Sequence, residues 1–412
     1  MRLQVRSAGI LSALRRRSST SGPPFPAFAA SRLLVLAAAV VAATRIDASG
    51  RANERKFDDE SLTHAFADGL LSPFARWDAT WFLEIARDGY EGGLDTAFFP
   101  LYPLLVRALV LPFPSEGALL VSAYVVSLAC FLGALWVLHR LVELELGRPV
   151  ATASVWLLAL FPAAVYFGAP YSESLFLLAS VGAFYAARTE RWAWAGALAA
   201  AASATRSAGL VLLVPLVLMW LESRPRRARN LAWLGLAPLG IAGYALYLGV
   251  DHGDALAFVD AQEAWHRDFA GPFVGVWDGA VAAWDGVRQL VSGSGQTVYF
   301  ERAGGDPEAV ARINLMLFGF LVFAAVAVAG AFRRLPRAYG AYALAALALP
   351  LSFPVDPQPL MSLPRFLAVL FPLFVWLAVV TEGRGRTVPV AAVSAAGLAL
   401  FTARFASWEW IA

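Results

Sequence analysis

The sequence predicts an all-α, polytopic membrane protein with about ten or eleven membrane spans. Hydrophobic residues make up 59% of its 412 residues and charged residues only 15%. Its mean hydropathy is +0.61, which lies outside the range of ordinary globular domains. Short Arg-rich clusters separate the apolar runs and carry most of the net charge of +3. This pattern is typical of cytoplasmic loops and gives no support for nucleic-acid binding.

The first apolar run follows a basic, Ser/Pro-rich segment and lacks a convincing cleavage site. We therefore expect a cytoplasmic basic tail at residues 1–27 and a first span at residues 28–46. A single domain, 28–412, would carry two long outer loops, 47–116 and 251–310. The other single spans are expected near 117–138, 150–168, 174–187, 231–250, 311–331, 338–353, 366–381 and 387–403.

The apolar stretch 192–221 has an unusual length, too long for one ordinary span and short for two. Arg-rich segments flank both of its ends, so both ends are expected on the cytoplasmic side. A hairpin that turns at Thr205-Arg206-Ser207-Ala208-Gly209 satisfies this condition and brings Arg206 near the outer surface. The alternative is one tilted helix, which would give ten spans and reverse every later one.

The segment Arg76–Pro103 concentrates charged and aromatic residues between the first two long apolar runs. Trp77, Trp81 and Ile85 recur every four residues, and a glycine that can end a helix follows. The spacing predicts a short amphipathic helix, from Asp78 to Asp88, at the membrane interface.

Asp78 stands at the start of this predicted helix, on its aqueous side. Aspartate is a favoured N-cap, so Asp78 could simply cap a helix that begins at Ala79. A chemical role is compatible with capping, since backbone N–H groups and the helix dipole hold a capping carboxylate ionised.

Four polar constellations share the outer face in this topology. Ionisable residues at membrane depth are costly, so Glu173 and Arg206 are functional candidates, although they could merely pair and join two spans. Trp284, Trp408 and Trp410 fit an interfacial aromatic belt. The constellations are Arg76-Asp78-Glu84-Asp88; Tyr171-Ser172-Glu173-Ser174; Thr205-Arg206-Ser207; and Gln262, Glu263, Trp265, His266 and Arg267 with Ser362 and Arg365.

The residue types favour acid–base chemistry over metal chemistry. Cys130 is the single cysteine, and the four histidines are scattered without metal-binding spacing, so no metal site is expected. An aspartate at the water boundary suits a general base, and arginines beside it suit a lipid-linked phosphate. With aromatic faces for sugar rings, this set predicts glycosyl transfer from a polyprenyl-phosphate sugar at the outer face.

Five motifs in order resemble the GPI mannosyltransferase II (PIG-V) family: RWDATWFLEIARDGY with FFPLYPLL, FPAAVYFGAPYSESLFLL, ATRSAGLVL, QEAWHR and SLPRFLAVLFPLF. The resemblance, over about residues 70–380, implies an inverting glycosyltransferase of GT-C type that uses dolichyl- or polyprenyl-phosphate mannose. It implies that Asp78 is the catalytic base. The expected substrate-binding residues are Arg76, Trp77, Glu84, Tyr171, Glu173, Arg206, Gln262, Trp265, Arg267 and Arg365.

The resemblance also implies partners and location. The donor would be a polyprenyl- or dolichyl-phosphate sugar and the acceptor a lipid or glycan, with the active site on the extracytoplasmic face of the plasma membrane. No cofactor or divalent cation is expected, although Asp78, Glu84 and Asp88 could recruit a cation loosely. The alternatives are a transporter or lipid-linked saccharide flippase, with Glu173 and Arg206 at a midplane site, and a non-catalytic membrane partner.

Overall fold

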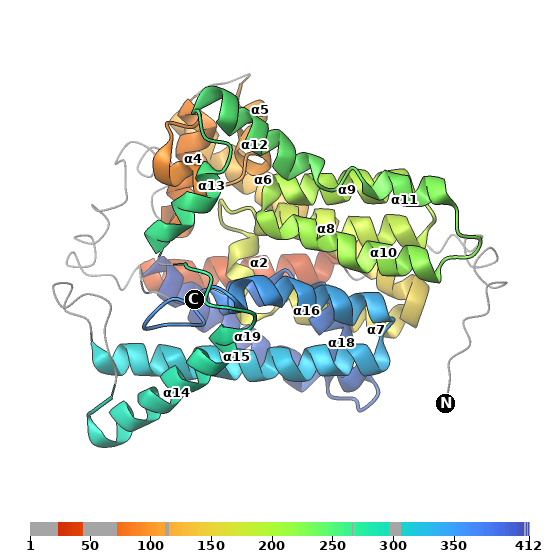
Figure 1. Cartoon of the computed structure of the whole chain (residues 1–412). Coiled ribbons are helices and arrows are strands. Elements are labelled where there is room, and N and C mark those ends of the chain that lie inside the picture. Colours follow the sequence, from red (N-terminus) through yellow and green to blue (C-terminus); the bar gives the residue numbers. More distant parts are fainter. Residues whose placement is uncertain are drawn as a thin grey trace.

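The computed structural model describes residues 24–43, 72–111, 115–265, 267–295, 306–407, 409 and 411. Every regular element in these ranges is helical, which confirms the all-α prediction. Most of the predicted basic tail and the polar start of the first loop lie outside the described residues. The long helices lie side by side as a bundle, with α4, α5, α12 and α13 gathered at one end (Figure 1).

The elements follow one another without any strand in the described ranges. The α-helices are α2 (Pro24–Ala43), α4 (Asp78–Asp88), α5 (Leu101–Val110), α6 (Glu116–Leu146), α7 (Arg148–Ala159), α8 (Glu173–Arg188), α9 (Trp192–Thr205), α10 (Leu213–Glu222), α11 (Ala228–Leu234), α12 (Leu239–Asp251), α13 (Ala257–Asp260), α14 (Val274–Ser292), α15 (Pro307–Arg334), α16 (Arg337–Leu351), α17 (Leu363–Ala368), α18 (Phe371–Glu382) and α19 (Thr387–Ala406). The 3₁₀ helices are η3 (Ser72–Phe74), η4 (Gly93–Ala97), η5 (Pro162–Phe167), η6 (Ser207–Leu212) and η7 (Ala261–Trp265).

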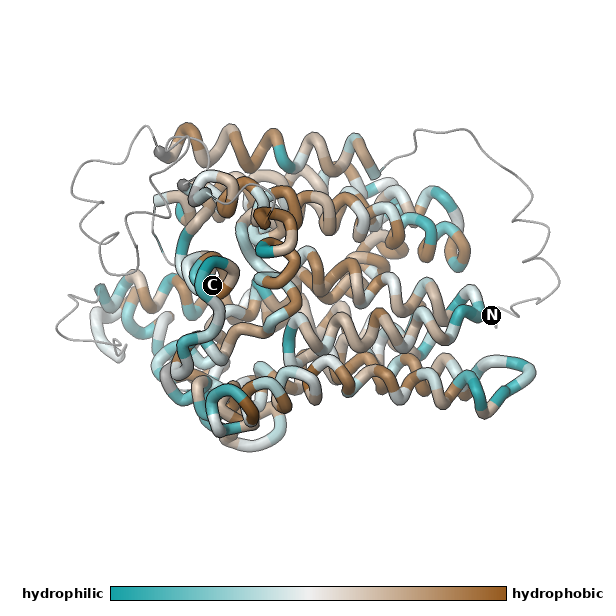
Figure 2. The backbone as a smooth tube through the Cα atoms, turned by 90° about the horizontal axis from the view of Figure 1, so that it is seen from above, coloured by the Kyte–Doolittle hydropathy of each residue, from teal (hydrophilic) through white to brown (hydrophobic). Residues whose placement is uncertain are grey.

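Five helical segments of the described chain are long and apolar enough to cross a membrane: Pro24–Ala42, Gly117–Leu146, Ala228–Asp251, Pro307–Arg334 and Thr387–Ala406. Three shorter apolar segments accompany them: Leu101–Val110, Ser207–Glu222 and Phe371–Glu382. Hydrophilic residues gather toward the ends of the bundle (Figure 2). The fold is that of a polytopic membrane protein, and the count of ten or eleven spans stays a prediction.

Several predicted boundaries differ from the structure. The span expected near 150–168 is divided into α7 and η5, and the one near 366–381 corresponds to α18, which begins only at Phe371. The first helix begins at Pro24 instead of residue 28, because proline is tolerated in the first turn, where its missing N–H costs no hydrogen bond. Helix α6 continues past residue 138 to Leu146. The segment 251–310 is not only a loop, since it contains α14, which packs along α15. Trp284 of α14 is 64% exposed, as expected of an interfacial tryptophan.

The stretch 192–221 is broken into α9, η6 and α10, so the single tilted helix is wrong. Arg206, between α9 and η6, has an extended backbone with φ −158° and ψ 146°. A Cβ on Gly209 would lie 2.2 Å from the carbonyl carbon of Ala202 and from the nitrogen of Ser203. This contact shows that η6 folds back directly onto α9, at the turn that the sequence predicts.

Helix α4 is anchored by its aromatic residues. Phe82 packs edge-on against Phe98 and Tyr102, with ring centroids 5.2 and 5.1 Å apart. The hydroxyl of Tyr102 donates to the Ala123 carbonyl of α6 at 3.0 Å and shares a 2.8 Å hydrogen bond with Ser127. Because Phe82 and Tyr102 are almost fully buried, they fix the rotation of α4 and hence the direction of Asp78.

Candidate active site

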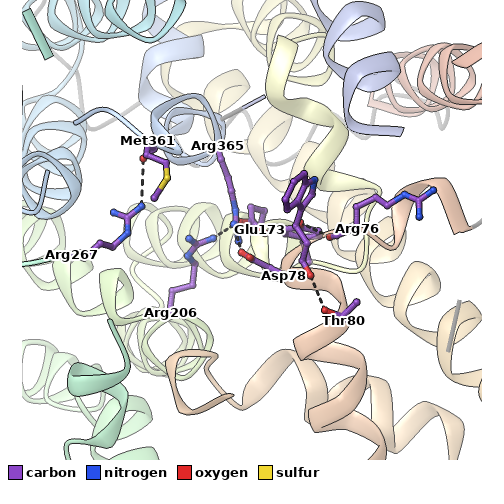
Figure 3. A network of polar contacts seen from close by, with 10 residues as sticks. Arg76, Asp78, Thr80, Glu173, Arg206, Arg267, Met361 and Arg365 are labelled. Carbon is purple, nitrogen blue, oxygen red and sulfur yellow. Dashed lines mark hydrogen bonds and ion pairs between the residues drawn. The ribbon is translucent and has the colours of Figure 1, made fainter. Parts of the chain in front are cut away.

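Arg365 joins two carboxylates that come from distant parts of the chain. Its Nη1 donates to Oδ2 of Asp78, and its Nε donates to Oε1 of Glu173. Nη1 of Arg206 donates to the same Glu173 oxygen. These four side chains form one continuous polar cluster (Figure 3). We call Asp78, Glu173, Arg206 and Arg365 the charged cluster.

The chain folds so that helix ends meet at this cluster. Asp78 is the first residue of α4 and Glu173 the first residue of α8, where the helix dipole favours negative charge. Arg365 lies in the last turn of the short helix α17. The Glu173–Arg206 pairing that the sequence suggested is therefore present, and Arg365 extends it to Asp78.

The predicted helix 78–88 is confirmed, whereas the N-cap interpretation of Asp78 is wrong. The N-cap residue is Trp77, which makes no capping hydrogen bond with its side chain, and Asp78 is already helical. Trp77 has φ 58°, and Ser362, the residue before α17, has φ 67°. A left-handed backbone is costly for residues other than glycine and is concentrated at functional sites. Both helices that supply Asp78 and Arg365 are thus preceded by a strained residue.

The two carboxylates differ in their access to solvent. The Glu173 side chain is fully buried, whereas that of Asp78 is 26% exposed. Arg365 and Arg206 are intermediate, at 13% and 20%. Glu173 therefore anchors the two arginines from the protein interior. Asp78 is the carboxylate that a substrate could reach.

Tyr171 and Tyr166 enclose Arg365. The guanidinium carbon lies 4.8 Å from the centroid of the Tyr171 ring and 5.5 Å from that of Tyr166. The Tyr171 hydroxyl donates to the Arg76 carbonyl at 2.8 Å. Burial raises the pKa of the Tyr171 hydroxyl well above its ordinary value, so the hydroxyl stays a donor. This hydrogen bond ties the turn before α8 to the chain just before Asp78.

A third arginine adds positive charge beside the cluster. The guanidinium carbons of Arg206 and Arg267 lie 5.7 and 5.6 Å from the centroid of Phe366. Nη2 of Arg267 also donates to the Met361 carbonyl at 3.5 Å. The charged cluster and Arg267 thus bring three guanidinium groups together, and guanidinium groups suit an anionic ligand.

The other predicted site residues have different surroundings. The Arg76 guanidinium points away from the charged cluster (Figure 3), and Arg76 contributes its carbonyl instead. Glu84, six residues after Asp78, occupies another side of α4. The Gln262 carbonyl accepts from the Arg267 backbone N–H at 3.4 Å. Trp265 belongs to η7, but its side chain lies outside the described residues.

Sequence reasoning did not single out Tyr166 or Phe366 as site residues. Both are apolar in pattern and lie among other hydrophobic residues, so periodicity gives no signal for them. The available hint was that Tyr166 lies inside the motif FPAAVYFGAPYSES and that Phe366 is the last residue of the motif SLPRF.

The fold and the site together define a polytopic membrane protein that holds a partly accessible aspartate against two half-buried arginines and a buried glutamate. Residues 27–222 match the model of a family described as mannosyltransferase (PIG-V). The resemblance to this family is therefore confirmed for that part of the chain. Asp78, Glu173 and Arg206 lie within the matched segment, whereas Arg267 and Arg365 lie beyond it.

Individual relatives agree with the family match. The GPI alpha-1,6-mannosyltransferase 2 of Cricetulus griseus is 39% identical over 153 residues, which cover 35% of this chain and 31% of that protein. The corresponding protein of Homo sapiens is 36% identical over 152 residues, with the same coverage. The chain spans about a third of the length of the curated relatives it matches. Among solved structures, the Archaeoglobus fulgidus oligosaccharyltransferase is similar with a TM-score of 0.44 and 15% identity, covering 92% of this chain and 53% of that chain.

Proposed function

We propose that this protein is an inverting membrane glycosyltransferase of GT-C type that moves mannose from a polyprenyl- or dolichyl-phosphate donor to a lipid or glycan acceptor. The observation that carries the proposal is the ion pair of the partly exposed Asp78 with Arg365. The match of residues 27–222 to the mannosyltransferase family supports the sugar. The names of the relatives, GPI mannosyltransferases, support a lipid-linked acceptor.

Asp78 is the general base in this proposal. Its carboxylate takes the proton from an acceptor hydroxyl while that oxygen forms a bond to C1 of the sugar. The bond between C1 and the phosphate oxygen breaks, and polyprenyl phosphate leaves. Attack opposite the leaving phosphate inverts the configuration at C1. The partial exposure of Asp78 supports this role, because the acceptor must reach the carboxylate.

Arginines Arg206 and Arg267 are the residues proposed to hold the phosphate. They flank the same phenylalanine ring, and guanidinium groups suit phosphate oxygens both in the bound donor and as charge develops on the leaving group.

Arg365 is proposed to exchange its partner, from the Asp78 carboxylate to the donor phosphate. A phosphate that enters beside Arg206 competes with Asp78 for the Arg365 guanidinium, since both are anions that accept from the same donors. Transfer of that contact to the phosphate would release the Asp78 carboxylate toward the acceptor. Glu173 would keep Arg365 in place throughout, because its own contact is with the Nε atom.

The proposed site of action is the extracytoplasmic face of the plasma membrane. Arg-rich loops, such as the one between α10 and α11, lie at the opposite end of the bundle from α4 (Figure 1). By the positive-inside rule these loops are cytoplasmic, which supports an outer position for Asp78.

The test is transfer of radiolabelled mannose from polyprenyl-phosphate mannose in membranes that carry the wild type, Asp78→Asn or Asp88→Asn. Asp88 is an exposed aspartate at the other end of α4 and makes the matched control. We expect transfer by the wild type and by Asp88→Asn, and a loss of about 100-fold or more in Asp78→Asn. Full turnover by Asp78→Asn would contradict the assigned base. Transfer only from another lipid-linked sugar would contradict mannose, and use of no lipid-linked sugar would favour a transporter.

A further inference from the structure

A pocket at the end of the bundle opposite the charged cluster has features of an anion site. It has a volume of about 360 Å³ and lies where the start of α9 meets the start of α11. Its position, near the loop between α10 and α11, is far from α4 (Figure 1). The lining residues are Glu190, Arg191, Trp192, Ala193, Trp194, Arg229, Asn230 and Trp233. We call it the α9–α11 pocket.

We infer that the α9–α11 pocket binds the phosphate group of an anionic membrane lipid. Arg191 and Arg229 supply two guanidinium groups, the side chains best suited to phosphate oxygens. The first turn of α9 adds the favourable end of a helix dipole. This inference does not depend on the proposed transfer reaction.

The two arginines are available to a ligand. Both are exposed, and neither guanidinium forms a hydrogen bond or an ion pair with another residue in the part of the chain that the structure describes. Neighbouring arginines differ, because Arg224 and Arg226 donate to the Leu221 carbonyl at 3.1 and 2.7 Å. The guanidinium N–H groups of Arg191 and Arg229 can therefore donate to a ligand in the α9–α11 pocket. Those of Arg224 and Arg226 instead stabilise the loop between α10 and α11.

The one acidic residue that lines the pocket is already engaged. The Glu190 carboxylate accepts a hydrogen bond from Nε1 of Trp192 at 2.9 Å. Two arginines against one glutamate leave an excess positive charge. Asn230, which is buried, adds a neutral polar side chain to the lining.

The surroundings favour a lipid over a free anion. Trp194 and Trp233 line the pocket and are 65% and 41% exposed. Exposed tryptophans are typical of the headgroup level of a bilayer. Arg229 and Trp233 also lie in the candidate span Ala228–Asp251, whose apolar window is only 22% buried inside the protein. Lipid chains would therefore lie beside this span, and basic pockets at span ends on the cytoplasmic side suit anionic headgroups.

A glycine fixes the geometry under the pocket. A Cβ on Gly196 of α9 would lie 2.0 Å from the Trp233 carbonyl oxygen of α11. The two helices consequently touch backbone to backbone, as small residues permit between membrane helices. This contact holds Arg191 and Arg229, one at the start of each helix, in the lining of one pocket.

The test uses the purified full chain in a neutral detergent and isothermal titration calorimetry. The probes are dioctanoyl phosphatidylglycerol, dioctanoyl phosphatidylcholine and inorganic phosphate. The variant is R191Q/R229Q, and the matched control is R333Q/R334Q, which removes two exposed arginines from the last turn of α15. All four positions are exposed, and gel filtration checks that both variants remain folded.

We expect saturable binding of the phosphatidylglycerol, weakened about tenfold or more in R191Q/R229Q and unchanged in R333Q/R334Q. Equal weakening by both double variants would overturn the inference, since general electrostatic attraction would then explain the binding. Equal binding of phosphatidylcholine would overturn selection of an anionic lipid. Inorganic phosphate that binds as tightly as the phosphatidylglycerol would overturn the lipid as the source of the anion.

Discussion

Arg365 forms an ion pair with Asp78 across a sequence separation of 287 residues, and its Nε simultaneously contacts Glu173. One guanidinium thus links the beginnings of α4 and α8 through α17. The two carboxylates differ in accessibility, because Glu173 is fully buried and Asp78 is partly exposed. Glu173 can therefore anchor the arginines, while Asp78 can be reached by a substrate.

Glu173→Gln should destabilise the protein markedly. The change leaves Arg206 and Arg365 without their shared buried anion, and breaking a buried pair costs about 3–5 kcal/mol. We expect a clear fall in the apparent Tm of the detergent-solubilised protein. Glu308→Gln is the control, since its pair with Arg312 is exposed on both sides and should contribute less than about 1 kcal/mol. Equal Tm values for the two variants would refute the anchoring role of Glu173.

Arg267→Gln should weaken donor use. Arg267 lies beside the charged cluster, where its guanidinium makes a 3.5 Å hydrogen bond to the Met361 carbonyl and a cation–π contact with Phe366. If it binds the donor phosphate, KM for the lipid-linked sugar should rise about tenfold or more.

Steady-state kinetics with varied donor, with Arg288→Gln as the control, provide the measurement. Arg288 forms an exposed pair with Asp285 on α14 and should leave KM unchanged. An unchanged KM in Arg267→Gln would remove this residue from the proposed phosphate site.

Gly209→Ala should disrupt the turn that presents Arg206. A Cβ at this position would meet the Ala202 and Ser203 backbone at 2.2 Å, and a backbone cannot move aside as a flexible side chain can. Overpacking of this kind costs about 1–3 kcal/mol or more. Gly319→Ala is the matched control, because nothing lies within 4 Å of its added methyl group. Thermal unfolding in detergent compares the two, and a Gly209→Ala protein as stable as the control would contradict the tight packing of η6 on α9.

Chelation should leave transfer unaffected. This prediction comes from the family resemblance, which implies a lipid-phosphate donor used without a divalent cation. Membranes treated with EDTA should transfer mannose at the untreated rate. A rate that falls with EDTA and recovers with added Mg²⁺ or Mn²⁺ would show that a cation assists the phosphate, and the roles of Arg206 and Arg267 would need revision.

The sequence by itself determined the helical membrane class, the helix 78–88 with Asp78 at its start, and the reversal near Arg206. Each rests on a local signal: hydropathy over one span, a four-residue period, or basic residues on both sides of an apolar stretch. Such signals depend only on residues that are close in the sequence, so they can be recognised before the tertiary structure is known.

Only the tertiary structure decided which side chains meet. It joined Arg365 to Asp78 and Glu173, turned the Arg76 guanidinium away, gave Tyr171 a bracing hydrogen bond and made part of the second predicted loop into α14. These outcomes depend on how separate helices pack and rotate against one another. That packing is set by side-chain shapes such as those of Phe82 and Tyr102, and no periodicity within a single segment encodes it.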